Sequence, residues 1–384
     1  MRLLKPITTV TFIHGSYIHG VMADSIEHED GRKAVSGGGS NAVWEWIGGF
    51  RGRRLDLTVV VLSVLMTAGI VLDFRNHATG ISFEEEGFFT PEHVFFYTAF
   101  LCIAATLVSV TYYNRRQGSS WISAVPDGYQ LGVLGVFMFG FGGFGDYLWH
   151  STFGFETGVE ALTSPTHLLL ASGAILFVSS PLRATWYAEE ETRGKDLVPA
   201  VISATLAVLT LLLFTLYASP LNEVIPAESN SYAALGLGVS SILIYSAIMT
   251  GSSLTLVRRF TLPPGTFTFL FGVTSVAITF PSANFEFVPA MVVAGVFADV
   301  LYRFTRPSLE SVRSFRLFAA LVPLAMFSLY YVTIWVNSGI LWTIHVWAGS
   351  IVLAGITGLL LSYLMLPSSR DVVATPERGR GHER

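Results

Sequence analysis

Ten long apolar segments dominate this chain and limit the folds that are open to it. We place them at residues 56–74, 92–113, 127–149, 165–182, 197–219, 231–256, 266–282, 286–304, 314–335 and 340–366. Their lengths are close to what an α-helix needs to cross a bilayer, and charged residues make up only 13% of the chain. Because a segment in lipid must satisfy its backbone hydrogen bonds internally, the sequence predicts an all-α, polytopic membrane protein of about ten transmembrane helices.

Lysine and arginine are distributed unevenly between the segments that join these apolar stretches. They lie before the first segment, after every second one and in the C-terminal tail, whereas the intervening loops contain one cation, Arg75, and several glutamates. Positive residues concentrate on the cytoplasmic side of membrane proteins. We therefore expect a multi-pass cell-membrane protein with both termini cytoplasmic and the glutamate-bearing loops extracytoplasmic. The lipid bilayer is its expected partner, association with other membrane subunits is left open, and no nucleic acid is expected.

A histidine pattern occurs twice in the first half of the chain. The first copy reads Asp73-Phe-Arg-Asn-His77 and then Thr90-Pro-Glu-His93; the second reads Asp146-Tyr-Leu-Trp-His150 and then Ser164-Pro-Thr-His167. The Asp and first His recur after 73 residues and the second His after 74, although the chain has only nine histidines. This register indicates a duplicated unit, which predicts two helical hairpins in the same orientation, a parallel repeat known in membrane proteins.

The residue types in the pattern are those that bind metals. An Asp and a His four residues apart share one helix face, while Ser or Thr followed by Pro is typical of a helix start. A His two residues after that Pro lies at the positive end of the helix dipole, which favours the neutral imidazole that coordinates metal. A hydrogen-bonded Asp–His pair at a helix end explains a single copy as well, but two copies in register favour metal ligands. The candidate ligands are Asp146, His150, His167, Asp73, His77 and His93.

Three further residues are candidate accessory ligands. Glu86 and Glu160 occupy equivalent loop positions, although a solvated acidic loop explains them equally well. His345, flanked by Trp342 and Trp347, is a further candidate ligand or pocket residue, or else an interfacial histidine among anchoring tryptophans. Carboxylate and imidazole suit copper, zinc or iron, and a single cysteine argues against a thiolate site. No catalytic residue is assigned.

At these residues the sequence resembles the C subunit of the particulate methane and ammonia monooxygenases, the copper membrane monooxygenase family. In that family an Asp, three residues and a His close one membrane helix, and Thr-Pro-Ser-His opens the next. Asp146-Tyr-Leu-Trp-His150 and Ser164-Pro-Thr-His167 are similar to that motif. The resemblance implies copper ligands at Asp146, His150 and His167 and, through the repeat, at Asp73, His77 and His93. It covers only these motifs, the loop between the two histidines is longer here, and this chain has more spans.

Several functions remain open for an outer-face site of this kind. A copper-dependent, monooxygenase-like oxidoreductase, or a subunit of one, would act on a small apolar substrate. A metal transport or handling protein would need polar residues that continue through the bilayer. A zinc-dependent hydrolase is the third option, because helix-end Asp/His zinc sites also occur in alkaline ceramidase-like membrane hydrolases. The last is an accessory membrane protein without catalysis.

We divide the chain into four parts. Residues 1–54 form a cytoplasmic arm that we expect to be partly disordered, and residues 368–384 a disordered tail. Residues 55–185 form a four-helix unit that holds the repeat, and residues 186–367 a six-helix unit. We expect both copies of the pattern to face one outer cavity. In the alternative, Arg75 pairs with Asp73, and the first copy only stabilises helix ends.

Overall fold

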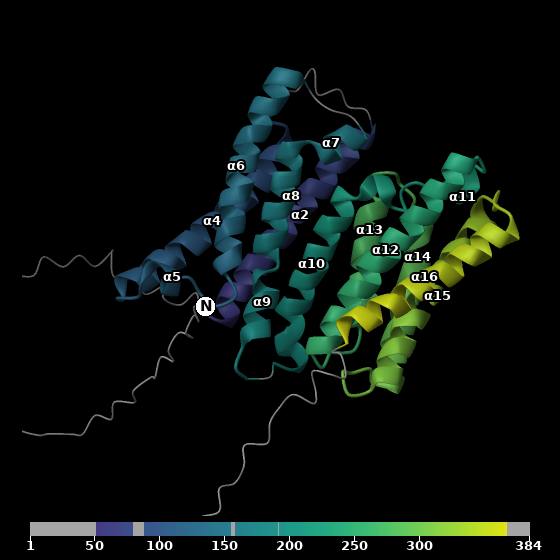
Figure 1. The fold of residues 1–384 in the computed structure, drawn as a ribbon. Coiled ribbons are helices and arrows are strands. Elements are labelled where there is room, and N and C mark those ends of the chain that lie inside the picture. The colour runs from purple at the N-terminus through teal and green to yellow at the C-terminus, as the bar shows by residue number, and fades with distance from the viewer. Residues whose placement is uncertain (1–50, 80–87, 155–157, 191, 367–384) are drawn as a thin grey trace, which may run out of the picture. The chain divides into compact units, whose positions relative to one another are not determined.

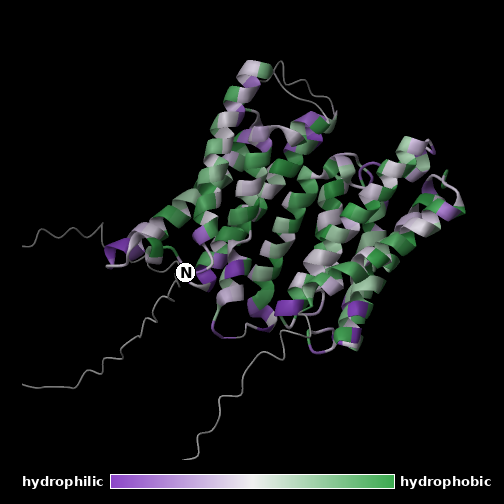
Figure 2. Ribbon diagram, viewed as in Figure 1, coloured by the Kyte–Doolittle hydropathy of each residue, from purple (hydrophilic) through white to green (hydrophobic). Residues whose placement is uncertain are grey.

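The computed structural model describes residues 51–79, 88–154, 158–190 and 192–366 (Figure 1). These residues fold into α-helices and short 3-10 turns and contain no strand. Nine of the helices are long and apolar enough to cross a membrane, which confirms the predicted all-α, polytopic membrane class. Figure 2 shows hydrophobic residues along the middle of the helices and most hydrophilic residues near their ends. Most of residues 1–54, and the tail, lie outside the described residues.

The two copies of the histidine pattern form two helical hairpins. The four long helices are α2 (Arg53–Thr79), α4 (Pro91–Arg116), α6 (Gln130–Phe153) and α8 (Pro165–Val178), and α9 (Ser180–Tyr187) continues α8 after Ser179. Short helices α5 (Trp121–Ala124) and α7 (Val159–Thr163) lie in the connections. Helix α2 packs against α4, and α6 packs against α8. The histidine-bearing ends of both hairpins line one cavity, so the hairpins have the same orientation, as predicted.

Helix α10 joins this four-helix group to the rest of the protein. It spans Val198–Phe214 after the 3-10 turn η1 (Gly194–Leu197), and it packs against α2 and α8 as well as against α12 and α13. In its most apolar stretch 72% of the residues are buried within the protein, compared with at most 50% in any other described span. Helix α10 therefore belongs to the core of both groups.

The second group contains five helices after α10. They are α12 (Tyr232–Arg259), α13 (Thr266–Thr279), α14 (Phe287–Thr305), α15 (Val312–Asn337) and α16 (Ile344–Met365), reached through η2 (Leu216–Ala218) and α11 (Ile225–Glu228). Neighbours in sequence pack together from α13 to α16, and α16 returns to pack against α12. Large aromatic side chains fill this group, including the fully buried Phe267, Phe318 and Tyr330.

One predicted span is too short to cross the bilayer alone. The segment predicted at 266–282 forms only α13, whose 14 residues reach about 21 Å, against a hydrocarbon core of about 30 Å. Its first amides bond to a carboxylate of the next helix: Asp299 accepts hydrogen bonds from Phe267 N at 3.2 Å and from Thr268 N at 2.9 Å. Asp299 on α14 thus satisfies N–H groups that have no partner within α13.

Glycines let α6 and α8 approach each other closely. A Cβ atom added at Gly173 on α8 would lie 2.7 Å from the carbonyl oxygen of Gly135 and 2.7 Å from the amide nitrogen of Phe139, both on α6. These are backbone atoms and cannot move aside. Glycine is therefore required at this crossing, as at other close helix contacts in membranes.

Candidate metal centre

Both second histidines are held at helix starts by the same local structure. Thr90 and Ser164 are the N-caps of α4 and α8, a proline follows each, and the cap hydroxyl accepts a hydrogen bond from the backbone N–H of His93 or His167. This is the predicted helix-start geometry. It places each imidazole in the first turn, beside the Asp that lies near the C-terminal end of the preceding long helix.

The second copy brings its three candidate ligands together. We name Asp146, His150 and His167 the Asp146 triad; their ligand atoms all lie within 4.8 Å of one another. The Nε2 atoms of His150 and His167 lie 3.5 and 3.6 Å from the same oxygen, Asp146 Oδ1. The Asp146 side chain is only 2% exposed. A carboxylate buried to this extent needs compensating positive charge or hydrogen bonds.

These distances are long for hydrogen bonds and also match the separation of two ligands of one ion. An N–H···O hydrogen bond normally measures about 2.7–3.2 Å between heavy atoms. Ligands held about 2.0–2.2 Å from one tetrahedral ion lie about 3.4 Å apart. The separations of 3.5 and 3.6 Å between Asp146 Oδ1 and the two Nε2 atoms are close to that coordination edge.

The outer ring nitrogens fix which atom of the imidazole faces the carboxylate. Nδ1 of His150 lies 3.3 Å from the carbonyl oxygen of Gly154, the residue that ends α6 with a φ of 81°. Nδ1 of His93 lies 2.5 Å from the carbonyl oxygen of Phe88. A carbonyl oxygen only accepts, so a hydrogen bond at either position needs the proton on Nδ1, and a neutral ring of that tautomer has its lone pair on Nε2, toward the Asp. Nδ1 of His167 lies 2.6 Å from the Ser164 hydroxyl, which can donate or accept, so either tautomer fits there. A lone pair facing a carboxylate is repulsive unless a cation or proton lies between them.

The first copy has the same pairs in a more open arrangement. We name Asp73, His77 and His93 the Asp73 triad. Nε2 of His93 lies 3.5 Å from Asp73 Oδ1, whereas Nε2 of His77 lies 3.5 Å from Asp73 Oδ2. The two imidazoles therefore contact different oxygens of the carboxylate. The Asp73 and His77 side chains are 13% and 32% exposed, so this triad is also more open to its surroundings.

The two triads lie at one cavity and are linked by an aromatic ring. All six residues line a cavity of about 1250 Å³. The centre of the Phe88 ring lies 5.0 Å from that of His93 and 6.1 Å from that of His150. Phe88 therefore contacts one imidazole of each triad, and the predicted common cavity is present.

Polar residues around the carboxylates differ between the copies. Thr166 Oγ1 donates a 2.9 Å hydrogen bond to Asp146 Oδ1 and so orients this carboxylate. Among the described residues, buried Asp73 Oδ1 has no hydrogen-bond partner, and neither does the buried Tyr97 hydroxyl. The residue equivalent to Thr166 in the first copy is Glu92, which follows Pro91 as Thr166 follows Pro165.

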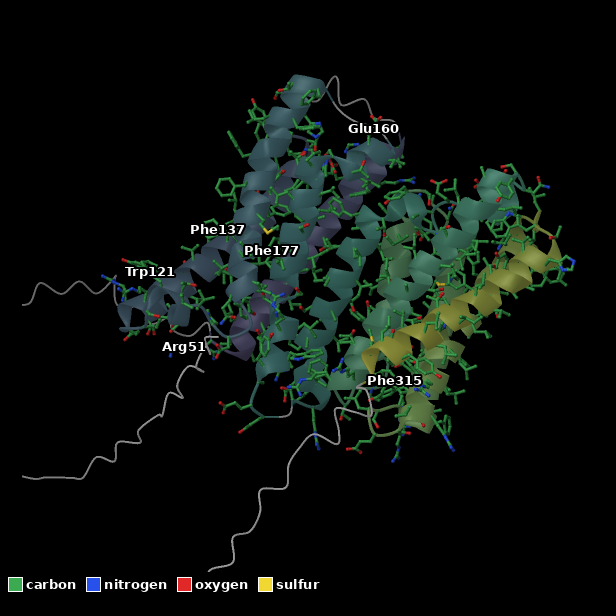
Figure 3. The ribbon with its side chains drawn as sticks, in the orientation of Figure 1. Arg51, Trp121, Phe137, Glu160, Phe177 and Phe315 are labelled. Carbon is green, nitrogen blue, oxygen red and sulfur yellow. The ribbon has the colours of Figure 1, made fainter. Side chains whose placement is uncertain are left out.

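The accessory candidates are not brought to the triads. Glu160 is exposed on α7 and is not among the residues that line the cavity (Figure 3). His345 is exposed in the first turn of α16 and does not line it either. Glu86 lies outside the described residues. Our alternative pairing of Arg75 is not observed among the described residues: its guanidinium donates to the carbonyl oxygens of Phe280 and Pro281, at 3.3 and 2.7 Å.

Sequence reasoning missed three residues at this centre: Thr166, Phe88 and Tyr97. Thr166 carried a usable signal, because it lies inside the repeated motif and has a hydroxyl. Phe88 and Tyr97 carried none, since their positions depend on how the hairpins pack. The centre of the Tyr97 ring lies 6.2 Å from that of His93, and the Tyr97 ring packs against Gly143 of α6. Comparisons of this chain with models of protein families, with curated proteins and with solved structures give no match.

Proposed function

We propose that this protein is an integral membrane metalloprotein whose Asp146 triad holds a transition metal. The proposal rests mainly on one observation: the Nε2 atoms of His150 and His167 face the same buried oxygen, Asp146 Oδ1, at 3.5 and 3.6 Å. Asp146, His150 and His167 would be the ligands, and Thr166 would orient the carboxylate. When bound, the metal would supply redox or Lewis-acid chemistry at the mouth of the cavity.

We further propose copper as the metal and a monooxygenase-like oxidoreductase, or a subunit of one, as the functional class. The resemblance of the Asp146 and His167 motifs to copper ligands supports this choice, and imidazole with carboxylate suits copper. The site in this proposal faces the outer side, because the cation-rich helix ends lie opposite the triads. A cysteine placed at Gly154 in a Cys102→Ala background should react with an impermeant reagent added from outside; reaction only from inside would reverse the orientation.

Transport of metal through the four-helix group is less well supported. Below the triads the cavity wall includes Phe96 and Phe139, and Phe177 packs beside Phe139 with ring centres 5.6 Å apart. Phe139 and Phe177 are 2% and 0% exposed. An ion leaving the triads toward the inner side would therefore meet packed aromatic side chains rather than further ligands, at a high desolvation cost.

The test is metal content and metal identity in the purified protein. Protein loaded with copper should bind it through nitrogen ligands detectable by electron paramagnetic resonance. The double variant His150→Ala/His167→Ala should lose at least one equivalent. His345→Ala is the matched control, because His345 is exposed and away from the cavity, and it should keep full metal content. Unchanged copper content in the double variant would contradict the assignment of these ligands. Protein that retains only zinc would favour the zinc-dependent hydrolase.

A further inference from the structure

The cavity below the triads is much longer than a metal site requires. From His150 it continues along α6 to Phe139, a rise of about 16 Å, which is about half of the hydrocarbon thickness. Its volume of about 1250 Å³ exceeds the roughly 300–1,000 Å³ of most small-molecule pockets. Dioxygen or a small hydrocarbon would leave most of this space unfilled.

The wall changes from polar to apolar along this length. The triads, Asn222 and Glu223 line the cavity at the end where α10 passes into α11. Deeper along the helices most of the wall is apolar, with Ile70, Phe139 and Leu170 among its side chains, and the hydroxyls there are those of Ser240 and Ser241 on α12. An occupant that satisfies both ends needs a polar head beside the triads and an apolar body.

One face of α12 forms a side of the cavity. Leu237, Ser240, Ser241 and Ile244 all line it, and their spacing puts them on one helix face. Leu237 and Ile244 are nevertheless 66% and 42% exposed at the surface of the protein. Helix α12 is long and apolar enough to cross a membrane, so this side of the cavity would face the lipid.

We propose that the cavity binds a membrane-dissolved lipid amphiphile, a single hydrocarbon chain with a small polar head, which enters sideways along α12. The head lies beside the triads, and the chain lies against Leu170 and Phe139. The assignment of this amphiphile as a substrate rests on the proposed function, because any reaction at its polar head needs the metal. It replaces the small apolar substrate that the motif resemblance implies.

A photoreactive fatty acid tests this proposal. A stearic acid that carries a mid-chain diazirine is added to the full-length protein in lipid nanodiscs, and the cross-linked residues are mapped by mass spectrometry. We expect saturable labelling of α6 and α8 around Phe139 and Leu170, displaced by unlabelled oleic acid. Labelling of Leu360, which is exposed on α16, is the internal standard for contact with bulk lipid and should not saturate.

Tryptophan variants along α12 test whether the lipid enters there, and a tryptophan elsewhere on the surface controls for effects on folding. Ser240→Trp and Ile244→Trp place a bulky ring at exposed positions of this face of α12 and should lower cavity labelling at least five-fold relative to Leu360. Val332→Trp, at an exposed position of α15, should leave it unchanged. Labelling confined to lipid-facing surfaces, or cavity labelling unaffected by both tryptophans, would overturn the proposal. Metal content measured on the same samples shows separately whether the metal assignment fails.

Discussion

The two hairpins carry the same motif, but they do not build the same site. In the α6–α8 hairpin both imidazoles meet one oxygen of a carboxylate that is 2% exposed. In the α2–α4 hairpin they meet different oxygens of one that is 13% exposed. The three ligand types are identical, so the difference arises from packing and from neighbouring residues. Two equal motifs therefore predict the same ligand types without predicting equal affinity.

Glycine contacts explain part of this difference. In the second hairpin two glycines, Gly135 and Gly173, face each other across the crossing, so the backbones touch. In the first hairpin a Cβ atom at Gly69 would lie 2.8 Å from Phe95 Cδ1, 2.9 Å from Phe96 Cβ and 3.2 Å from the backbone nitrogen of Phe96. Two of these three atoms belong to side chains, whereas the atoms nearest to a Cβ at Gly173 are all backbone atoms of α6. The second pair therefore supports a tighter arrangement of its ligands.

The largest expected contrast is between His150→Ala and His77→Ala. Loss of a ligand from the Asp146 triad should weaken its metal binding more than about 100-fold, the upper limit for loss of a residue that only orients a ligand. His77→Ala, in the more open Asp73 triad, should remove only a more weakly bound metal ion. Titration with copper, followed by isothermal calorimetry, measures both. If both variants lose the tightly bound copper ion to the same extent, the two triads act as one site.

A smaller contrast is expected from the hydroxyl that orients Asp146. Thr166→Val keeps the shape of the side chain and removes the 2.9 Å hydrogen bond to Asp146 Oδ1. Metal affinity should fall about 10–100-fold. Thr163→Val is the matched control, because among the described residues the Thr163 hydroxyl donates to the Val159 carbonyl oxygen, within its own helix, and not to Asp146. If both valine variants bind copper like the parent protein, the carboxylate does not depend on Thr166.

The smallest effect concerns the helix crossing itself. Gly173→Ala inserts a methyl group against the backbone of Gly135 and Phe139 and should lower the free energy of unfolding by about 1–3 kcal/mol. Gly349→Ala on α16 has open space around it and should change stability by less than about 0.5 kcal/mol. Thermal unfolding in detergent compares the two variants. If the Gly173 variant is as stable as the Gly349 variant, the close crossing does not hold the second hairpin together.

Hydropathy and the motif together predicted much of this molecule, and the failures have physical causes. The apolar segments predicted the helices, because backbone in lipid has few alternatives to a helix, and the Ser/Thr-Pro starts predicted the caps of α4 and α8. The pairing of Arg75 with carbonyls 205 and 206 residues away has no local signal. Which carboxylate oxygen each imidazole meets is likewise decided by the approach of two helices, and one motif cannot encode it.

The short helix α13 has a consequence for how the chain enters the membrane. Its 14 residues are fewer than the roughly 17 or more that a segment needs to span a bilayer. Its first amides also depend on Asp299, which is supplied only after α14 has been synthesised. During biogenesis α13 should therefore wait at the insertion machinery and pass into the lipid with α14 as a pair. Asp299 would then be sheltered from hydrocarbon throughout, because the helix start that it caps travels with it.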